Sequence, residues 1–287
     1  MSKLTQIRDG AVAKRPTQQG DRQRLPDNSV GTPQLRDQSV TFDKLAENGT
    51  MNVTTNYTVT SDIGIILCDT TLGNLNVTLP SAVAEAGRRI MVKKVSSDSN
   101  GALLQTVGGQ FIDQAGTGGT NLQVINDSVT IVSDGLNWQV VSRYYQQVNG
   151  IRYMAITQSF ANAVNTKVLY NGGQARYMTP TAGSALRIDY TAYYSISGNM
   201  RWLPNSAGNR RFTIVVNGVE VAGSSSPGIL DGGDTLQSAT CGQILLNAGD
   251  IVEGWAYQNS SGALSLHETP PQGNSITVNR IFSADDA

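Results

Sequence analysis

Alternating apolar and polar residues between Ala185 and Ile196 are the feature that most constrains the fold of this chain. An alternation of period two places every second side chain on one face of an extended strand. The apolar face of this predicted strand holds Leu186, Ile188, Tyr190, Ala192, Tyr194 and Ile196. Further on, two apolar runs flank Asn217-Gly218, the dipeptide most typical of a tight hairpin turn. Runs of this kind recur along the chain, so the sequence predicts an all-β protein.

The composition supports this fold class and excludes several kinds of partner. Charged residues make up 15% of the chain and hydrophobic residues 39%, with 30 Gly, whereas helices favour Ala, Leu, Glu and Lys. A formal net charge of −1 gives no overall positive field for a phosphate backbone, so we expect no nucleic-acid partner. The N-terminal residues lack an apolar stretch, and no apolar run reaches about 18 residues, so we expect neither a secretion signal nor membrane insertion.

The cysteine and histidine content leaves little room for catalysis or metal binding. Cys68 and Cys241 lie far apart, and each is expected to be a buried strand residue. His267 is the single histidine, so one chain cannot build a His-based metal cluster. The acidic run 231–234 lacks the ordered ligand spacing of a calcium loop. We therefore expect no enzyme, no metal and no cofactor.

The competing enzymatic hypothesis is a depolymerase that cuts surface polysaccharide. Such hydrolysis needs two carboxylates about 5–9.5 Å apart. The C-terminal part of the chain offers several acidic residues, but nothing in their spacing marks a pair. No β-helix repeat is visible after residue 50 either. The hypothesis therefore stays an alternative.

The composition of residues 1–50 is typical of an extended arm that cannot form its own hydrophobic core. They contain a ten-residue repeat, in which residues 27–36 are followed by 37–46 with Asp, Ser, Val and Leu at matching places. Repeated units without a buried face stack on neighbours or on other chains. The residues predicted to make these contacts with other chains are Val30, Leu35, Val40 and Leu45. The alternative is a disordered linker.

Two β segments are expected to follow the arm. Residues 51–147 read as a small β spacer domain of short strands, closed by a hairpin around residues 134–137. Residues 148–287 read as a sandwich or jelly roll, because their strands are regularly spaced and separated by Gly- and Asn-rich turns. The composition and the strand pattern show no other marked change along the chain.

A loop within the second β segment is the most distinctive candidate for ligand binding. Residues 199–211 offer a Trp, three Arg and several amides, the set that stacks on sugar rings and hydrogen-bonds hydroxyls or carboxylates. The predicted receptor-binding residues are Arg201, Trp202, Asn205, Arg210 and Arg211. The alternative is that Trp202 covers the core or a trimer contact.

Several of these pieces resemble a known class of proteins. The Asp-x-Ser-Val and Lys-Leu-Ala pieces of the repeat resemble the arm and shaft of bacteriophage tail-fibre proteins. Segments within 57–138, among them 73–80 and 129–138, look like a small β domain common in those fibres. Residues 245–266 are similar to the C1q/TNF-like jelly roll.

This resemblance implies a function as well as a fold. It implies a homotrimeric virion fibre, assembled in the cytoplasm of the bacterial host. The fibre would be held to tail, baseplate or capsid proteins by residues 1–50. Its C-terminal knob would bind a glycan or protein on the host surface. The alternative is a head-mounted decoration fibre or a baseplate connector without receptor binding.

Overall fold

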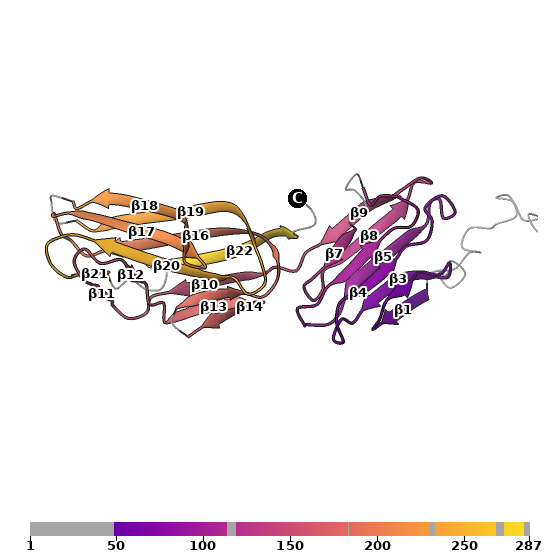
Figure 1. Cartoon of the computed structure of the whole chain (residues 1–287), viewed down its shortest axis with the longest axis horizontal. Helices are drawn as coiled ribbons and strands as arrows, with labels where there is room; N and C mark the ends of the chain where they lie inside the picture. The colour runs from indigo at the N-terminus through magenta and orange to yellow at the C-terminus, as the bar shows by residue number, and fades with distance from the viewer. Residues whose placement is uncertain (1–48, 114–118, 183, 230–232, 268–272, 284–287) are drawn as a thin grey trace, which may run out of the picture. The chain divides into compact units, whose positions relative to one another are not determined.

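The structure, a computed structural model, describes residues 49–113, 119–182, 184–229, 233–267 and 273–283. Within these ranges the ordered elements are β-strands and no helix occurs, which confirms the predicted all-β class (Figure 1). Val30, Leu35, Val40 and Leu45 lie outside the described residues. The buried apolar side chains form two clusters, one drawn from residues 53–138 and one from 124–278. Val124 belongs to the second cluster although it precedes the predicted boundary at residue 147.

The first cluster lies between two sheets, each of which begins with three parallel strands. One sheet contains, in spatial order, β1 (Gly49–Val53), β3 (Ile63–Cys68), β5 (Arg89–Lys94), β8 (Ser128–Ser133) and β9 (Trp138–Tyr144). The other contains β2 (Tyr57–Thr58), β4 (Leu75–Thr78), β6 (Ala102–Gln105) and β7 (Thr120–Leu122). The strands β1, β3 and β5 are parallel, and so are β2, β4 and β6. The chain therefore alternates between the two sheets and winds as a short parallel coil.

This parallel coil was not expected, because the sequence shows no β-helix repeat after residue 50. The successive turns of the coil begin at Gly49, Ile63 and Arg89, so their lengths are unequal. A coil with unequal turns has no fixed sequence period, and for that reason a search for repeats does not reveal it. The antiparallel hairpin β8–β9 that closes the segment was expected, and it is confirmed.

The second cluster fills an antiparallel sandwich. Its first sheet contains, in spatial order, β13 (Gly172–Arg176), β10 (Asn149–Tyr153), β22 (Ser275–Ser283), β16 (Ala192–Trp202) and β19 (Thr235–Leu246). Its second sheet contains β14 (Met178–Thr181), β15 (Ala185–Ile188), β20 (Ile251–Gln258), β17 (Asn209–Val216) and β18 (Val219–Pro227), with β12 (Thr166–Lys167) beside β20. A short pair, β11 (Ser159–Phe160) with β21 (Leu264–Ser265), lies apart. Apart from the hairpins β14–β15 and β17–β18, strands that are neighbours within these two sheets are far apart in sequence, which is the strand order of a jelly roll.

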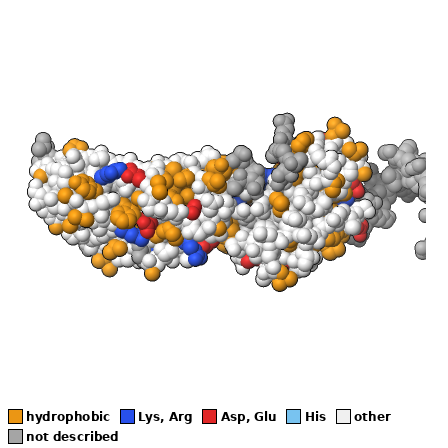
Figure 2. All heavy atoms as spheres, viewed as in Figure 1, with side chains coloured by type: hydrophobic (Ala, Val, Ile, Leu, Met, Phe, Trp, Pro, Cys, Tyr) orange, Lys and Arg blue, Asp and Glu red, His pale blue; other side chains and the backbone are white. Residues whose placement is uncertain are grey.

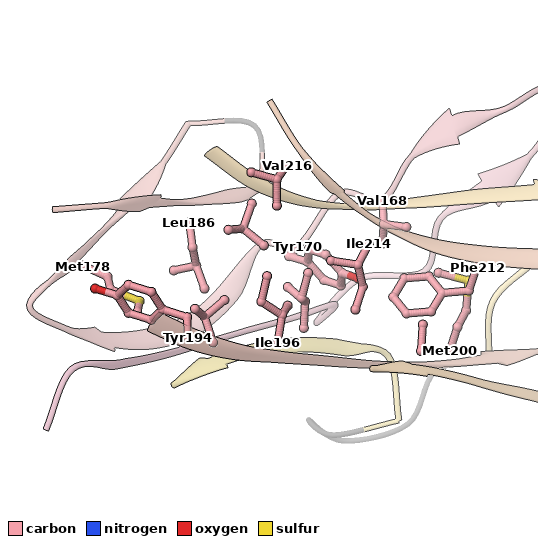
Figure 3. Close-up of a cluster of buried hydrophobic side chains, with 14 of the residues drawn as sticks. Val168, Tyr170, Met178, Leu186, Tyr194, Ile196, Met200, Phe212, Ile214 and Val216 are labelled. Atoms are coloured by element: carbon pink, nitrogen blue, oxygen red, sulfur yellow. The ribbon is translucent and has the colours of Figure 1, made fainter. Parts of the chain in front are cut away.

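The single strand predicted over residues 185–196 is wrong in one respect. The structure divides it into β15 and β16, which belong to opposite sheets and are joined by residues 189–191. All six apolar residues of the predicted face are nevertheless at most 6% exposed. The alternation continues across the break because both strands point their apolar side chains into the same core. Figure 3 shows Tyr194, Ile196 and Met200 facing Phe212, Ile214 and Val216 across that core.

The hairpin predicted at Asn217-Gly218 is confirmed, and it joins β17 to β18. Both residues have positive φ, 50° and 82°, the conformation that a two-residue type I′ turn requires.

Cys68 is buried as expected, and burial raises the pKa of its thiol to about 12. Cys241 is half-buried, and neither cysteine forms a disulfide.

Candidate functional site

Trp202 lies inside the jelly roll. Its side chain is 0% exposed, and its ring meets Phe160 edge-on with 5.2 Å between the ring centroids. The indole Nε1 donates a hydrogen bond to Gln237 Oε1 at 2.9 Å. A ring enclosed on all sides cannot stack on a sugar, so we remove Trp202 from the predicted receptor contacts. The alternative reading, in which Trp202 covers the core, agrees with this position.

Arg210 is also 0% exposed. Its guanidinium donates hydrogen bonds to the carbonyl oxygens of Asn205, Ala207 and Gly208 at 2.7, 2.5 and 3.1 Å. These three carbonyls belong to the loop between β16 and β17, so the buried guanidinium fixes the conformation of that loop by hydrogen bonds. Burial lowers the pKa of the guanidinium below its ordinary value. Arg210 therefore has a structural role and leaves the predicted receptor contacts as well.

The other predicted contacts are at the surface but do not form one site. Arg201 is ion-paired with Asp234, and Arg211 is ion-paired with Glu220 at 2.5 Å. Trp202, next to Arg201 on β16, points into the core, and so does Arg210, next to Arg211 on β17. Neighbouring side chains on a strand point to opposite faces, so Arg201 and Arg211 both point outward. Because β16 and β17 belong to different sheets, the two arginines project from opposite outer faces of the sandwich. Asn205 lies in the connecting loop, where its side chain accepts a hydrogen bond from the backbone N–H of Ala207 at 2.8 Å.

Within the described residues, no group of three or more His, Cys, Asp or Glu side chains could hold a metal ion. Asp234 of the acidic run is paired with Arg201, and Asp231 lies outside the described residues. The backbone N–H of His267 donates to the carbonyl oxygen of Arg201 at 2.8 Å.

No helix in the described ranges is long and apolar enough to cross a membrane.

A hollow in the first jelly-roll sheet is the strongest candidate site. It has a volume of about 410 Å³ and is lined by strands β13, β10 and β22. The lining residues are Asn149, Gly150, Ile151, Gln174, Ala175, Arg176, Thr277 and Asn279. This volume lies within the range of about 300–1,000 Å³ that is typical of ligand sites.

Strand register explains why these side chains meet. Asn149 pairs with Arg176 on one side and with Asn279 on the other, and Ile151 pairs in the same way with Gln174 and Thr277. Residues two apart on a strand share a face, so the six side chains form two rows of three. We call these six residues the strand grid.

Polar atoms of the strand grid are free to bind a ligand. The side chains of Asn149, Gln174, Thr277 and Asn279 make no hydrogen bond to any residue that the structure describes. Arg176 Nη2 lies 3.2 Å from the amide group of Gln146, and the guanidinium lies 5.4 Å from the ring centroid of Tyr177. No described carboxylate pairs with Arg176. The grid therefore offers three amides, one hydroxyl and one cation on rigid strands.

No residue of the strand grid stands out in the sequence. Each strand shows a pair of residues two apart, such as Gln174 and Arg176, but such pairs are common on exposed faces. The information that is missing from the sequence is the pairing of β10 with β22, whose partners lie about 130 positions apart.

Figure 2 shows one face of the molecule, on which orange side chains lie in small groups and blue and red groups are few, as the 15% charged content implies.

Comparison with known proteins identifies no family. No family model matches the chain, and no curated protein matches it. Similar solved structures include Eiger TNF from S. frugiperda, at 10% identity and a TM-score of 0.37, over 48% of this chain and 93% of that chain. Two crystal structures of murine APRIL match at 13% and 12% identity, with TM-scores of 0.37 and 0.36, over 47% of this chain and 100% of theirs. The fold assignment rests on the strand order described above.

Proposed function

We propose that this protein is a structural fibre of a bacteriophage particle that attaches to the surface of the host cell. Residues 1–50 hold it to other virion proteins, and the C-terminal jelly roll contacts the host. The ten-residue repeat and the order of the segments after it support the fibre assignment. The observation that carries the attachment role is the strand grid, an open array in which four polar side chains make no hydrogen bond to the described residues and the one cation has no carboxylate partner among them.

A rigid array is well suited to recognition. The grid residues come from three hydrogen-bonded strands rather than from loops, so their spacing is fixed before a ligand arrives. The backbone of the grid therefore loses little conformational entropy on binding, and the ordering cost falls on its side chains. A surface that is weakly charged overall also limits non-specific adsorption. These properties fit a protein whose task is to hold one surface against another.

The assembly that we propose is a homotrimer. An apolar row crosses the first sheet, where Tyr193 pairs with Leu245 on one side and with Phe282 on the other. Leu245 is 43% exposed, and the rings of Tyr193 and Phe282 lie 4.9 Å apart. Ser195, two residues from Tyr193, pairs with Asn279 of the strand grid, so the row and the grid share one outer face. The trimer that we propose buries the row at its axis and leaves the grid at the rim of the interface. Three copies also strengthen attachment to a repeating surface through effective concentration.

Adsorption of the purified full chain to a panel of bacterial strains tests the attachment role. We expect saturable binding to at least one strain, competed by unlabelled protein. Antibodies against the chain, viewed on phage particles by electron microscopy, should decorate a fibre. Decoration of the particle combined with no binding to any strain that the phage infects would reject the attachment role and leave a connecting component.

A further inference from the structure

We propose that the strand grid binds an acidic saccharide, in which sugar hydroxyls contact the amide and hydroxyl side chains and a carboxylate pairs with Arg176. This inference rests on the proposed attachment function and names the ligand class of the same site. The grid consists of the rows Arg176, Asn149, Asn279 and Gln174, Ile151, Thr277. The ligand class follows from the shape, the chemistry and the charge of these rows.

Shape comes from the sheet geometry. Neighbouring strands lie about 4.8 Å apart, and residues two apart on a strand lie about 7 Å apart. The three strands of the grid therefore spread its side chains over roughly 10 Å by 7 Å. Together with the volume of about 410 Å³, this area suits a small, compact ligand or one unit of a polymer. The hollow is open to solvent.

Chemistry selects hydroxyl groups. The side chains of Asn149, Gln174 and Asn279 each carry a carbonyl acceptor and an NH₂ donor, and Thr277 can both donate and accept. A sugar hydroxyl has the same double capacity, so a ring with several hydroxyls can satisfy several grid residues at once. Ile151, which is half-buried between the polar groups, offers an apolar floor for C–H groups.

Charge selects an acidic sugar over a neutral one. Arg176 has no carboxylate partner among the described residues, whereas Arg187, Arg201 and Arg211 are each ion-paired. Arg176 also lies at the end of its row, over the ring of Tyr177. A guanidinium can bind a carboxylate through two parallel hydrogen bonds. Such a pair with the ligand would place a uronic acid group at this end of the grid.

Binding of the full chain to immobilised alginate, a polyuronate, and to immobilised dextran, a neutral glucan, tests this proposal. We expect the wild-type chain to bind alginate more tightly than dextran. Arg176→Gln should weaken alginate binding about tenfold or more, because a charge-assisted contact is lost. It should leave dextran binding unchanged, while Asn279→Ala should weaken binding to both polymers. The side chain of Arg187 is 49% exposed, and because it lies on β15 of the other sheet, Arg187→Gln serves as the matched control.

The results have separate meanings for the two proposals. Alginate binding that is absent, weaker than dextran binding, or equal in wild type and Arg176→Gln would overturn the acidic-saccharide inference. Adsorption to bacteria that persists in Arg176→Gln would overturn it too, while the attachment function stands. Alginate binding that depends on Arg176, together with no adsorption to any strain, would instead reject the attachment function. Arg176 is exposed, so we expect its variant to fold, and thermal unfolding checks this.

Discussion

Trp202 illustrates how one position on a strand decides the role of a residue. It lies at the end of β16, where even-numbered side chains point into the core, and it packs against Phe160. The residue before it, Arg201, points outward to Asp234. Aromatic and basic residues that stand next to each other in the sequence are thus separated by the sheet. A ligand cannot use both.

Replacing Trp202 should therefore reduce stability. Trp202→Ala leaves a cavity and removes the partner of Gln237, and we expect a loss of about 3–5 kcal/mol in the free energy of unfolding. Trp202→Phe keeps a ring against Phe160 and loses mainly the hydrogen bond of the indole, so we expect a loss nearer 1 kcal/mol from that bond. Urea denaturation of both variants measures this. A Trp202→Ala chain of unchanged stability with impaired adsorption to bacteria would contradict the buried role.

At Gly198 of β16 the two facing sheets of the jelly roll contact each other closely. A Cβ atom added to Gly198 of β16 would lie 2.5 Å from Cζ of Phe212, which is fully buried on β17. We expect Gly198→Ala to cost about 1–3 kcal/mol, because the ring must move within a packed core. Gly242 of β19 is exposed, and a Cβ atom added there would meet no other atom within 4 Å. Gly242→Ala should change stability by less than about 0.5 kcal/mol, and chemical denaturation compares the pair.

The elements of the molecule were easier to predict than their pairing. The alternation over residues 185–196 correctly identified six buried side chains, and Asn217-Gly218 correctly located a turn. Alternation depends only on neighbouring residues, so the sequence displays it directly. Which sheet a strand joins depends on contacts between distant segments, and for that reason the break between β15 and β16 and the parallel coil were missed. The strand grid was missed for the same reason.

A polar network holds the connection between β5 and β6, and it should respond to acid. Burial alone would raise the pKa of Asp98, but hydrogen bonds from Thr70 and Ser96, a backbone hydrogen bond from Asn100 and the charge of Lys94 lower it to about 2. A carboxylate with a lowered pKa stabilises the fold above its unfolded-state pKa, near 3.9, and this contribution is lost as the pH falls.

Asp98→Asn should accordingly be less stable than the wild-type chain at neutral pH. The difference in the free energy of unfolding should stay constant down to about pH 4 and shrink between about pH 4 and pH 2, where the wild-type carboxylate takes up its proton. Urea denaturation at a series of pH values measures the difference. A gap that is the same at pH 2 and pH 7 would show that the charge of Asp98 does not carry the effect.

At the scale of the whole molecule, one buried ion pair connects the segment that holds the first core to the jelly roll. Arg280, on β22, reaches both carboxylate oxygens of Asp127, which directly precedes β8, at 3.1 Å. The two side chains are 2% and 0% exposed. Asp127 also accepts hydrogen bonds from the backbone N–H groups of Val124 and Gln146. The guanidinium lies 4.9 Å from the ring centroid of Tyr145, on the chain that links the two segments.

This arrangement should make the two segments unfold together. Removing one member of a buried pair typically costs about 3–5 kcal/mol because the other charge is left without a partner. We expect Asp127→Asn, which leaves the Arg280 cation buried, to lower stability by that amount and to split one calorimetric transition into two. Arg280→Met should be less harmful, since Asp127 keeps its backbone donors. The ion pair Arg187–Asp189 is exposed at its arginine, so Arg187→Met is the control and should cost less than about 1 kcal/mol. A single, unshifted transition in Asp127→Asn would mean that the segments are coupled by other contacts.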